Sequence, residues 1–83
     1  MVFSVRLFAR ARDIVGKDVA MVELPPGATV ADLRRCLNRD YPALKSLLEK
    51  SALAINNEFA SDSLLLPPNT EIALLPPVSG GQG

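Results

Sequence analysis

The chain has 83 residues, which is room for one small domain. Nine basic and nine acidic side chains cancel, so nucleic acid and anionic membranes, which are held by excess positive charge, are not expected partners. The absence of histidine excludes Ser-His-Asp triads and Cys-His dyads, and zinc sites built on Cys and His are excluded with them. The single cysteine cannot form an internal disulfide, which fits a reducing cytoplasm. We therefore expect a cytoplasmic protein whose own side chains are not the catalyst.

The first twelve residues allow two interpretations. Arg6, Arg10 and Arg12 occur with no acidic residue before Asp13, a pattern that mitochondrial transit peptides share. However, apolar side chains recur at every second position, at Phe3, Val5, Leu7 and Ala9. This period of two is typical of a half-buried strand, and removing it would cost a small domain much of its core. We therefore predict a first strand here.

The next segment predicts a strand and the start of a helix. Gly16 between charged residues indicates a turn over residues 13–18, and residues 19–24 form a second strand that pairs with the first. The run Pro25-Pro26-Gly27 ends this strand. Thr29 is a candidate helix N-cap, and Asp32, three residues later, can bond back toward it as in a capping box.

The predicted helix has one apolar stripe and ends near Pro42. The stripe consists of Val30, Leu33, Cys36, Leu37 and Tyr41. The opposite face of the helix, which would contact water, carries mostly Arg34, Arg35 and Arg39. Cys36 is expected to pack in the core rather than to act in redox chemistry, and Tyr41 is also expected in the core.

The second half of the chain predicts short elements. Residues 43–50 form a helical turn that buries Leu44, Leu47 and Leu48, and residues 53–56 and 58–60 form strands around the Asn56-Asn57 turn. Phe59 is expected in the core. A brief apolar run at 64–66 stops at Pro67, and residues 71–75 form the last strand. This order predicts an α+β fold of the β-grasp (ubiquitin-like) type, a mixed sheet with one main helix packed across it. We expect a domain over residues 1–77 and a flexible Gly-rich tail over 78–83.

The C-terminal tail decides the function proposed from sequence. No charged side chain occurs between Ile72 and Gly83. A Gly-Gly pair near a chain end is by itself weak evidence for a function. Its context is more specific, because a strand runs into Pro76-Pro77-Val78-Ser79-Gly80-Gly81. With residues 5–12 before Gly16, residues 29–33 and residues 54–57, this block resembles the MoaD family, the small sulfur-carrier subunit of molybdopterin synthase. The Pro-Pro favours this family over the thiamine sulfur carriers.

The resemblance implies a non-catalytic carrier subunit of a sulfur-transferring enzyme complex, with the catalytic side chains in the large subunit. In the family the terminal glycine carboxylate, here Gly81 after Gly80, is adenylated by an ATP-using, E1-like enzyme of the MoeB type and converted to a thiocarboxylate. The tail then enters the large subunit, MoaE, whose residues transfer the sulfur to precursor Z (cyclic pyranopterin monophosphate). The carrier itself binds no cofactor.

The residue types of the tail suit this role. Glycines at 80 and 81 lack a Cβ and can pass a narrow channel, and Pro76 and Pro77 stiffen the exit from the fold. The six residues from Leu75 to Gly81 reach about 20 Å at roughly 3.3 Å each. Val78 and Ser79 would bind the partner together with the two prolines, and the uncharged tail enters a pocket without desolvating an ion.

One feature departs from the family pattern. Gln82 and Gly83 follow Gly81, so the reacting carboxylate is absent until they are removed. A peptidase removes them, or Gly83 itself is activated, or this copy has lost sulfur transfer. Two other functions also stay open, an interaction module without sulfur transfer and a carrier for thiamine synthesis or tRNA thiolation.

Phe8 is the candidate anchor for a partner on the folded body. It falls on the face of the first strand opposite Phe3, Val5 and Leu7, unless a loop or the second helical segment covers it. Leu74 and Leu75 point to opposite faces of the last strand, so one of them joins the surface around Phe8. We select Leu75 as the partner-binding residue. Arg10 is expected to bind the partner, and Arg10 and Arg12 either steer an acidic surface or are simply solvated.

Overall fold

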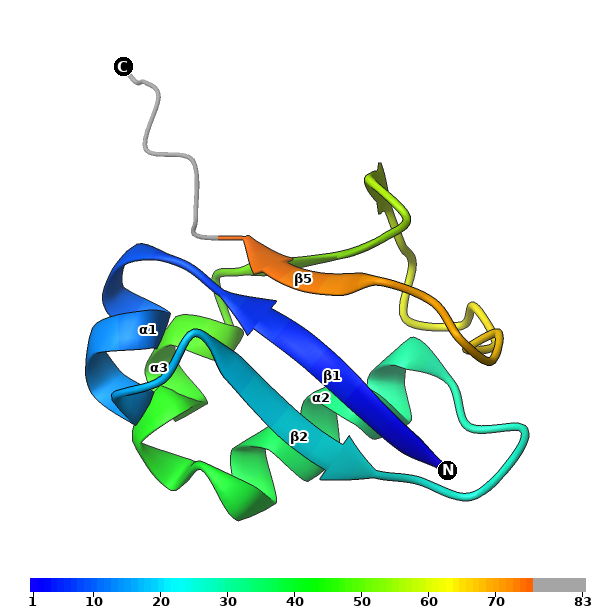
Figure 1. Cartoon of the computed structure of the whole chain (residues 1–83), viewed down its shortest axis with the longest axis horizontal. Coiled ribbons are helices and arrows are strands. Elements are labelled where there is room, and N and C mark those ends of the chain that lie inside the picture. Colours follow the sequence, from blue (N-terminus) through cyan, green and yellow to red (C-terminus); the bar gives the residue numbers. More distant parts are fainter. Residues whose placement is uncertain (76–83) are drawn as a thin grey trace.

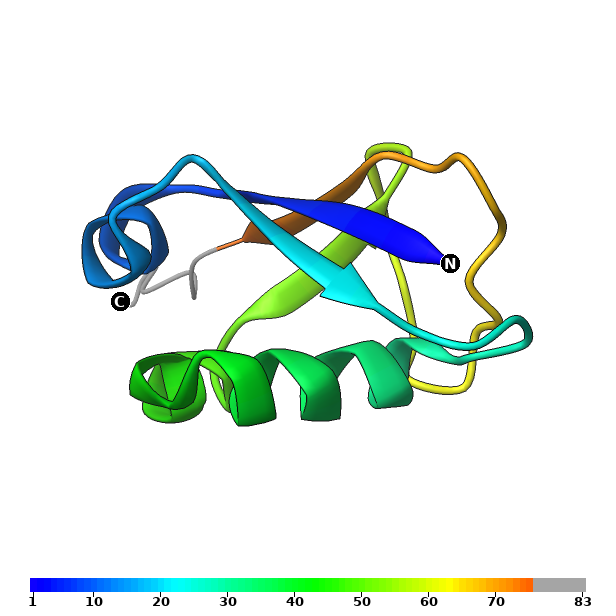
Figure 2. The ribbon, with the colours of Figure 1, turned by 60° about the horizontal axis from the view of Figure 1, so that its bottom comes forward.

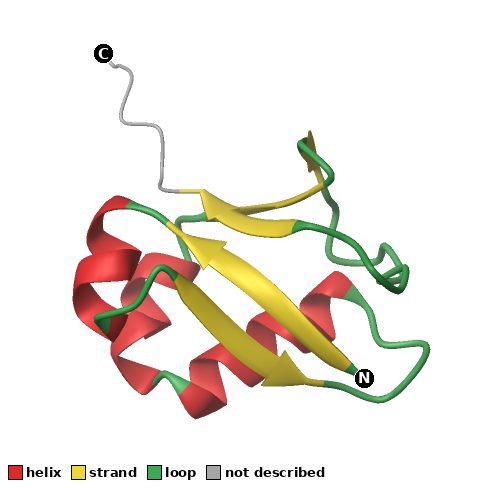
Figure 3. Ribbon diagram, viewed as in Figure 1, coloured by secondary structure: helices red, strands yellow, loops and turns green. Residues whose placement is uncertain are grey.

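The computed structural model describes residues 1–75, which form a five-stranded sheet with helices against it (Figures 1 and 3). The strands are β1 (Val2–Leu7), β2 (Val19–Glu23), β3 (Ala52–Ile55), β4 (Glu58–Phe59) and β5 (Ile72–Leu75). The helices are α1 (Ala9–Val15), α2 (Val30–Asp40), the 3₁₀ turn η1 (Pro42–Leu44) and α3 (Lys45–Leu48). This arrangement confirms the predicted β-grasp fold. The predicted tail and the residues from Pro76 onward lie outside the described part of the chain.

The last strand lies in the centre of the sheet. The strand order is β2-β1-β5-β3-β4, with β1 parallel to β5 and all other neighbours antiparallel. Residues far apart in sequence therefore lie side by side, such as Val5 and Ile72. The inward side chains of β5, Ile72 and Leu74, are fully buried. Leu75 is therefore the last residue of a central strand that is paired on both sides.

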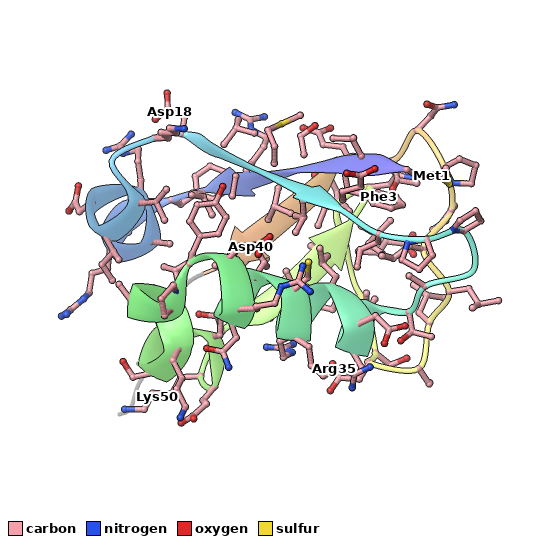
Figure 4. The ribbon with its side chains drawn as sticks, turned by 90° about the horizontal axis from the view of Figure 1, so that it is seen from below. Met1, Phe3, Asp18, Arg35, Asp40 and Lys50 are labelled. Atoms are coloured by element: carbon pink, nitrogen blue, oxygen red, sulfur yellow. The ribbon has the colours of Figure 1, made fainter. Side chains whose placement is uncertain are left out.

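Helix α2 covers one face of the sheet and supplies much of the core (Figure 2). The predicted apolar stripe is confirmed, since Val30, Leu33, Cys36 and Leu37 are buried, while Tyr41 is half-buried against the core. Charged side chains on this side of the molecule, such as Arg35 and Lys50, point away from the sheet (Figure 4). Among the described residues, no helix covers the opposite face of the sheet (Figure 2).

The predicted capping box is present at the start of α2. The Asp32 N–H donates to the Thr29 hydroxyl at 3.3 Å, and the Thr29 N–H donates to the Asp32 carboxylate at 3.0 Å. The hydrogen bond from the Thr29 N–H stabilises the ionised carboxylate and lowers the pKa of Asp32, and the Thr29 hydroxyl and the charge of Arg35 act in the same direction. Two backbone groups that a helix start leaves open are satisfied in this way.

The prediction was wrong between residues 9 and 15, where α1 replaces the end of the predicted strand and part of the predicted turn. The strand alternation stops at Leu7, and Ala9 begins the helix with a φ of 50°. The turn itself starts only at Gly16, which has a φ of 80° and caps the helix. Only Ala11 of α1 is buried. A seven-residue helix with one small buried side chain has no apolar stripe, so its period is not visible in the sequence.

The prediction was also wrong for Phe59, which was expected in the core but is 77% exposed. It lies on β4, a two-residue strand at the edge of the sheet, and faces the side that carries no helix. The turn before it agrees with the prediction, since Asn56 and Asn57 have φ values of 52° and 70°. The segment over 43–50 is also helical as predicted, with Leu44 and Leu48 buried and Leu47 half-buried.

Candidate partner-binding site

The uncovered face of the sheet carries a hollow beside the end of β5. Its volume is about 200 Å³, and its lining comes from four strands, from the turn before β4 and from the residues that directly follow β1 and precede β5. The lining residues are Arg6, Phe8, Ala54, Asn57, Phe59, Glu71, Ala73 and Leu75. We call this feature the sheet hollow.

Strand register brings these residues together. Ala73 of β5 pairs with Arg6 on one side and with Ala54 on the other, and Ala54 pairs in turn with Phe59. Because side chains alternate along a strand, Glu71, Ala73 and Leu75 point to the same face. The sheet hollow is therefore a direct consequence of the central position of β5.

One ion pair lies at the sheet hollow. An Arg6 guanidinium nitrogen donates to the Glu71 carboxylate at 3.1 Å, and the two side chains are 57% and 58% exposed. The guanidinium carbon lies 5.6 Å from the centre of the Phe8 ring, within cation–π distance. The Glu71 backbone is fixed by Asn56, which donates its N–H to the Glu71 carbonyl at 2.8 Å and accepts from the Glu71 N–H at 3.1 Å. Two aromatic rings, small alanines and a neutralised charge pair make this a surface suited to binding another protein.

Comparison with known proteins identifies the family. The ThiS family profile matches residues 5–81, which includes every residue that lines the sheet hollow. The chain belongs to the ThiS family. It is 42% identical over 82 residues to the molybdopterin synthase sulfur carrier subunit of Dictyostelium discoideum, with 95% of each chain covered. This confirms the resemblance found in the sequence.

Solved structures agree in fold. SAMP1 from Haloferax volcanii superposes with a TM-score of 0.83 at 30% identity, covering 98% of this chain and 100% of that one. A chain from the complex of subunits 1 and 2 of molybdopterin-converting factor from Helicobacter pylori 26695 has a TM-score of 0.69 at 27% identity, with 98% and 100% covered. The second structure is that of a complex between the two subunits.

The predicted site residues fall into three groups. Phe8 is exposed and lines the sheet hollow, as does the half-buried Leu75, whereas Leu74 is buried in the core. Arg10 is exposed but lies at a different hollow, between α1 and α3, with Ile14, Ser46, Leu47 and Lys50. Residues Pro76 to Gly81 lie outside the described part of the chain. That any of these residues binds a partner stays a prediction.

Sequence reasoning missed Phe59 and Glu71 as members of this surface. The available signal was that Arg6 and Phe8 share one face of the first strand, but nothing local places Phe59 beside them. Their proximity depends on the crossing from β1 to β5 and β3, which only the folded chain defines.

Other chemistry-bearing groups among residues 1–75 do not form a site. Cys36 is buried, and burial followed by the Asp40 carboxylate raises the pKa of its thiol. This agrees with the predicted packing role. No three His, Cys, Asp or Glu side chains in this part of the chain are placed to hold a metal ion. No helix over the same residues has the length and apolar character needed to cross a membrane.

Proposed function

We propose that this chain is the sulfur-carrier small subunit of molybdopterin synthase and that Gly81 carries the sulfur as a thiocarboxylate. The observation that carries this proposal is the 42% identity to a sulfur carrier subunit over 95% of both chains. The match to subunit 1 and 2 of a molybdopterin-converting factor supports a large-subunit partner of the MoaE type. The substrate of the assembled enzyme would be precursor Z, in molybdenum cofactor biosynthesis.

The geometry supports a carrier that delivers its own C-terminal segment. The sheet hollow ends at Leu75, and six residues further along the chain is Gly81. An extended segment of that length reaches about 20 Å, so a partner on the sheet face can receive Gly81 in its own active site. The catalytic side chains would then belong to the large subunit, and this chain contributes the reacting carboxylate.

The proposed cycle requires two further proteins, an activating enzyme and a peptidase. An E1-like activating enzyme of the MoeB type uses ATP to adenylate the Gly81 carboxylate, and sulfur then replaces AMP. A peptidase first removes Gln82 and Gly83, because the carboxylate of Gly81 is otherwise tied up in a peptide bond. These steps are proposed to occur in the cytoplasm, consistent with a single buried cysteine.

The test compares the full chain with a variant that ends at Gly81. Each is incubated with the activating enzyme, ATP and a sulfide source, and its intact mass is measured. We expect only the shorter chain to gain the mass of one oxygen replaced by sulfur, and a chain ending at Gly80 serves as the control. Sulfur gained by the full chain would assign the site to Gly83, and no gain by either would favour an interaction module without sulfur transfer.

A second measurement addresses processing in the cell. The intact mass of the native protein should correspond to a chain that has lost Gln82 and Gly83. If all of the native protein keeps both residues, the proposed removal is wrong.

A further inference from the structure

We infer that the hollow between α1 and α3 binds the carboxylate of this chain's own Gly81, through Arg10 and Lys50, whenever the carrier is not bound to a partner. The hollow has a volume of about 270 Å³ and is lined by Arg10, Ile14, Ser46, Leu47 and Lys50. We call it the helix hollow. The inference rests on the proposed function, because Gly81 has a free carboxylate only after Gln82 and Gly83 have been removed.

The helix hollow contains two cations without an ion-pair partner among residues 1–75. Each of the other five arginines in the chain pairs with an Asp or Glu side chain, whereas Arg10 does not, and neither does Lys50. Both side chains are exposed. Of the nearest acidic side chains, Asp13 lines an adjoining hollow with Arg10, and Glu49 lines a different hollow. Asp13 offsets only one of the two positive charges, so the helix hollow attracts an anion.

The helix hollow is within reach of the residue from which the tail starts. β1 is parallel to β5 and Leu7 pairs with Leu74, so both strands end at the same edge of the sheet, where α1 begins (Figures 1 and 2). Arg10 follows Leu7 by three residues, and its Cα is therefore at most about 20 Å from that of Leu75. The segment from Leu75 to Gly81 spans about 20 Å when extended, and the Arg10 side chain adds to this reach. Gly81 can meet Arg10 without any change in the fold.

The tail offers one anionic group to these cations. Residues 72–81 contain no charged side chain, so the Gly81 carboxylate is the only group there that Arg10 and Lys50 attract strongly. The apolar part of the helix hollow also finds a partner, since Val78 lies three residues before Gly81 and can cover Ile14, which is 38% exposed. A thiocarboxylate carries the same charge and would be held in the same way. The carrier would thus keep its reactive end on its own surface until a partner draws it into an active site.

The test measures the pKa of the Gly81 carboxylate in the isolated chain that ends at Gly81, from the chemical shift of its isotope-labelled carbonyl carbon. A terminal carboxyl ordinarily has a pKa of about 3.3–3.7, and nearby cations lower it. The variant Arg10→Gln/Lys50→Gln is compared with Lys17→Gln/Lys45→Gln, which removes two exposed cations that do not line the helix hollow. We expect the first variant to raise the pKa by about half a unit and the control to raise it by no more than about 0.1 unit. If the two variants raise it equally, or neither raises it, the inference is wrong.

A second measurement uses the chain ending at Gly81 without substitutions, so it does not depend on how a variant folds. Nuclear Overhauser contacts from the methyl groups of Ile14 and Leu47 to protons of Val78 or Gly81 support the inference, and their absence overturns it. The spectrum is repeated at tenfold lower protein concentration. Contacts that disappear on dilution come from the tail of a second copy, which also contradicts the inference.

The two proposals fail in different ways. Neither measurement includes a partner protein, so a chain that forms the thiocarboxylate but shows neither the shifted pKa nor the contacts refutes this inference alone. A chain ending at Gly81 that gains no sulfur from the activating enzyme refutes the proposed function instead.

Discussion

Replacing Phe59 with alanine should separate partner binding from folding. Fully burying a phenylalanine side chain is worth about 3 kcal/mol at most. Phe59 is 77% exposed, so only about a quarter of that value, or roughly 0.7 kcal/mol, favours folding of the isolated chain. Phe59→Ala should therefore lower the free energy of unfolding by less than about 1 kcal/mol.

The larger effect should occur in the complex. A partner that covers the rest of the ring gains about 2 kcal/mol from it, and each 1.4 kcal/mol corresponds to a factor of ten in Kd. Phe59→Ala should therefore weaken binding to the large subunit roughly 30-fold. An aromatic side chain at the centre of an interface commonly has an effect of this size.

Both quantities are measured on the same protein preparations, by urea unfolding and by titration calorimetry. Met21→Ala is the matched control, because Met21 is 55% exposed on edge strand β2 and does not line the sheet hollow. We expect the control to change Kd less than threefold. The reasoning is refuted if Phe59→Ala leaves Kd unchanged, or if it destabilises the isolated chain by as much as a core substitution does.

Three further predictions concern the isolated chain. Ala9→Gly should raise the free energy of unfolding by about 0.5–1 kcal/mol in urea, because relieving a φ of 50° outweighs the added chain entropy; an unchanged or lower value would contradict the strain. Asp32→Asn should have a lower free energy of unfolding than the wild type at neutral pH. The difference should shrink as pH falls through the lowered pKa of Asp32, below about 3.9, because protonation of the wild-type carboxylate removes the same charged capping interaction. A difference in the free energy of unfolding that does not depend on pH would contradict this prediction. Cys36 should react with iodoacetamide far more slowly in the folded chain than in urea, since burial raises its pKa; equal rates would contradict it.

Local signals predicted the parts of the fold that local chemistry determines. The capping box of Thr29 and Asp32 is a bond between residues three apart, so the sequence pattern contains it completely. The Asn56-Asn57 turn is similar, because these side chains tolerate the left-handed conformation that the turn requires. Alternation in β1 and the stripe of α2 likewise identified the buried side chains.

Contacts between distant segments were not predictable in the same way. Arg34 was expected mostly in water, but it donates to the carbonyls of Leu48 and Ser51 at 2.7 and 3.1 Å and pairs with Asp62 at 3.5 Å. Phe59 was expected in the core because alternation cannot tell which face of an edge strand is left uncovered. The sheet hollow combines four strands, so no local pattern could have indicated it.

The central position of β5 also sets the order of events during synthesis. A ribosome makes the chain from the N-terminus, so β1, β2, β3 and β4 are all complete before the strand that joins them. Until Ile72 to Leu75 have emerged, the chain contains two separate strand pairs with a gap where Ile72 and Leu74 belong. Folding that depends on such distant pairing is delayed until the last contact is available. We therefore expect a product truncated before β5 not to fold, so that only a chain translated through β5 presents a domain for partners to recognise.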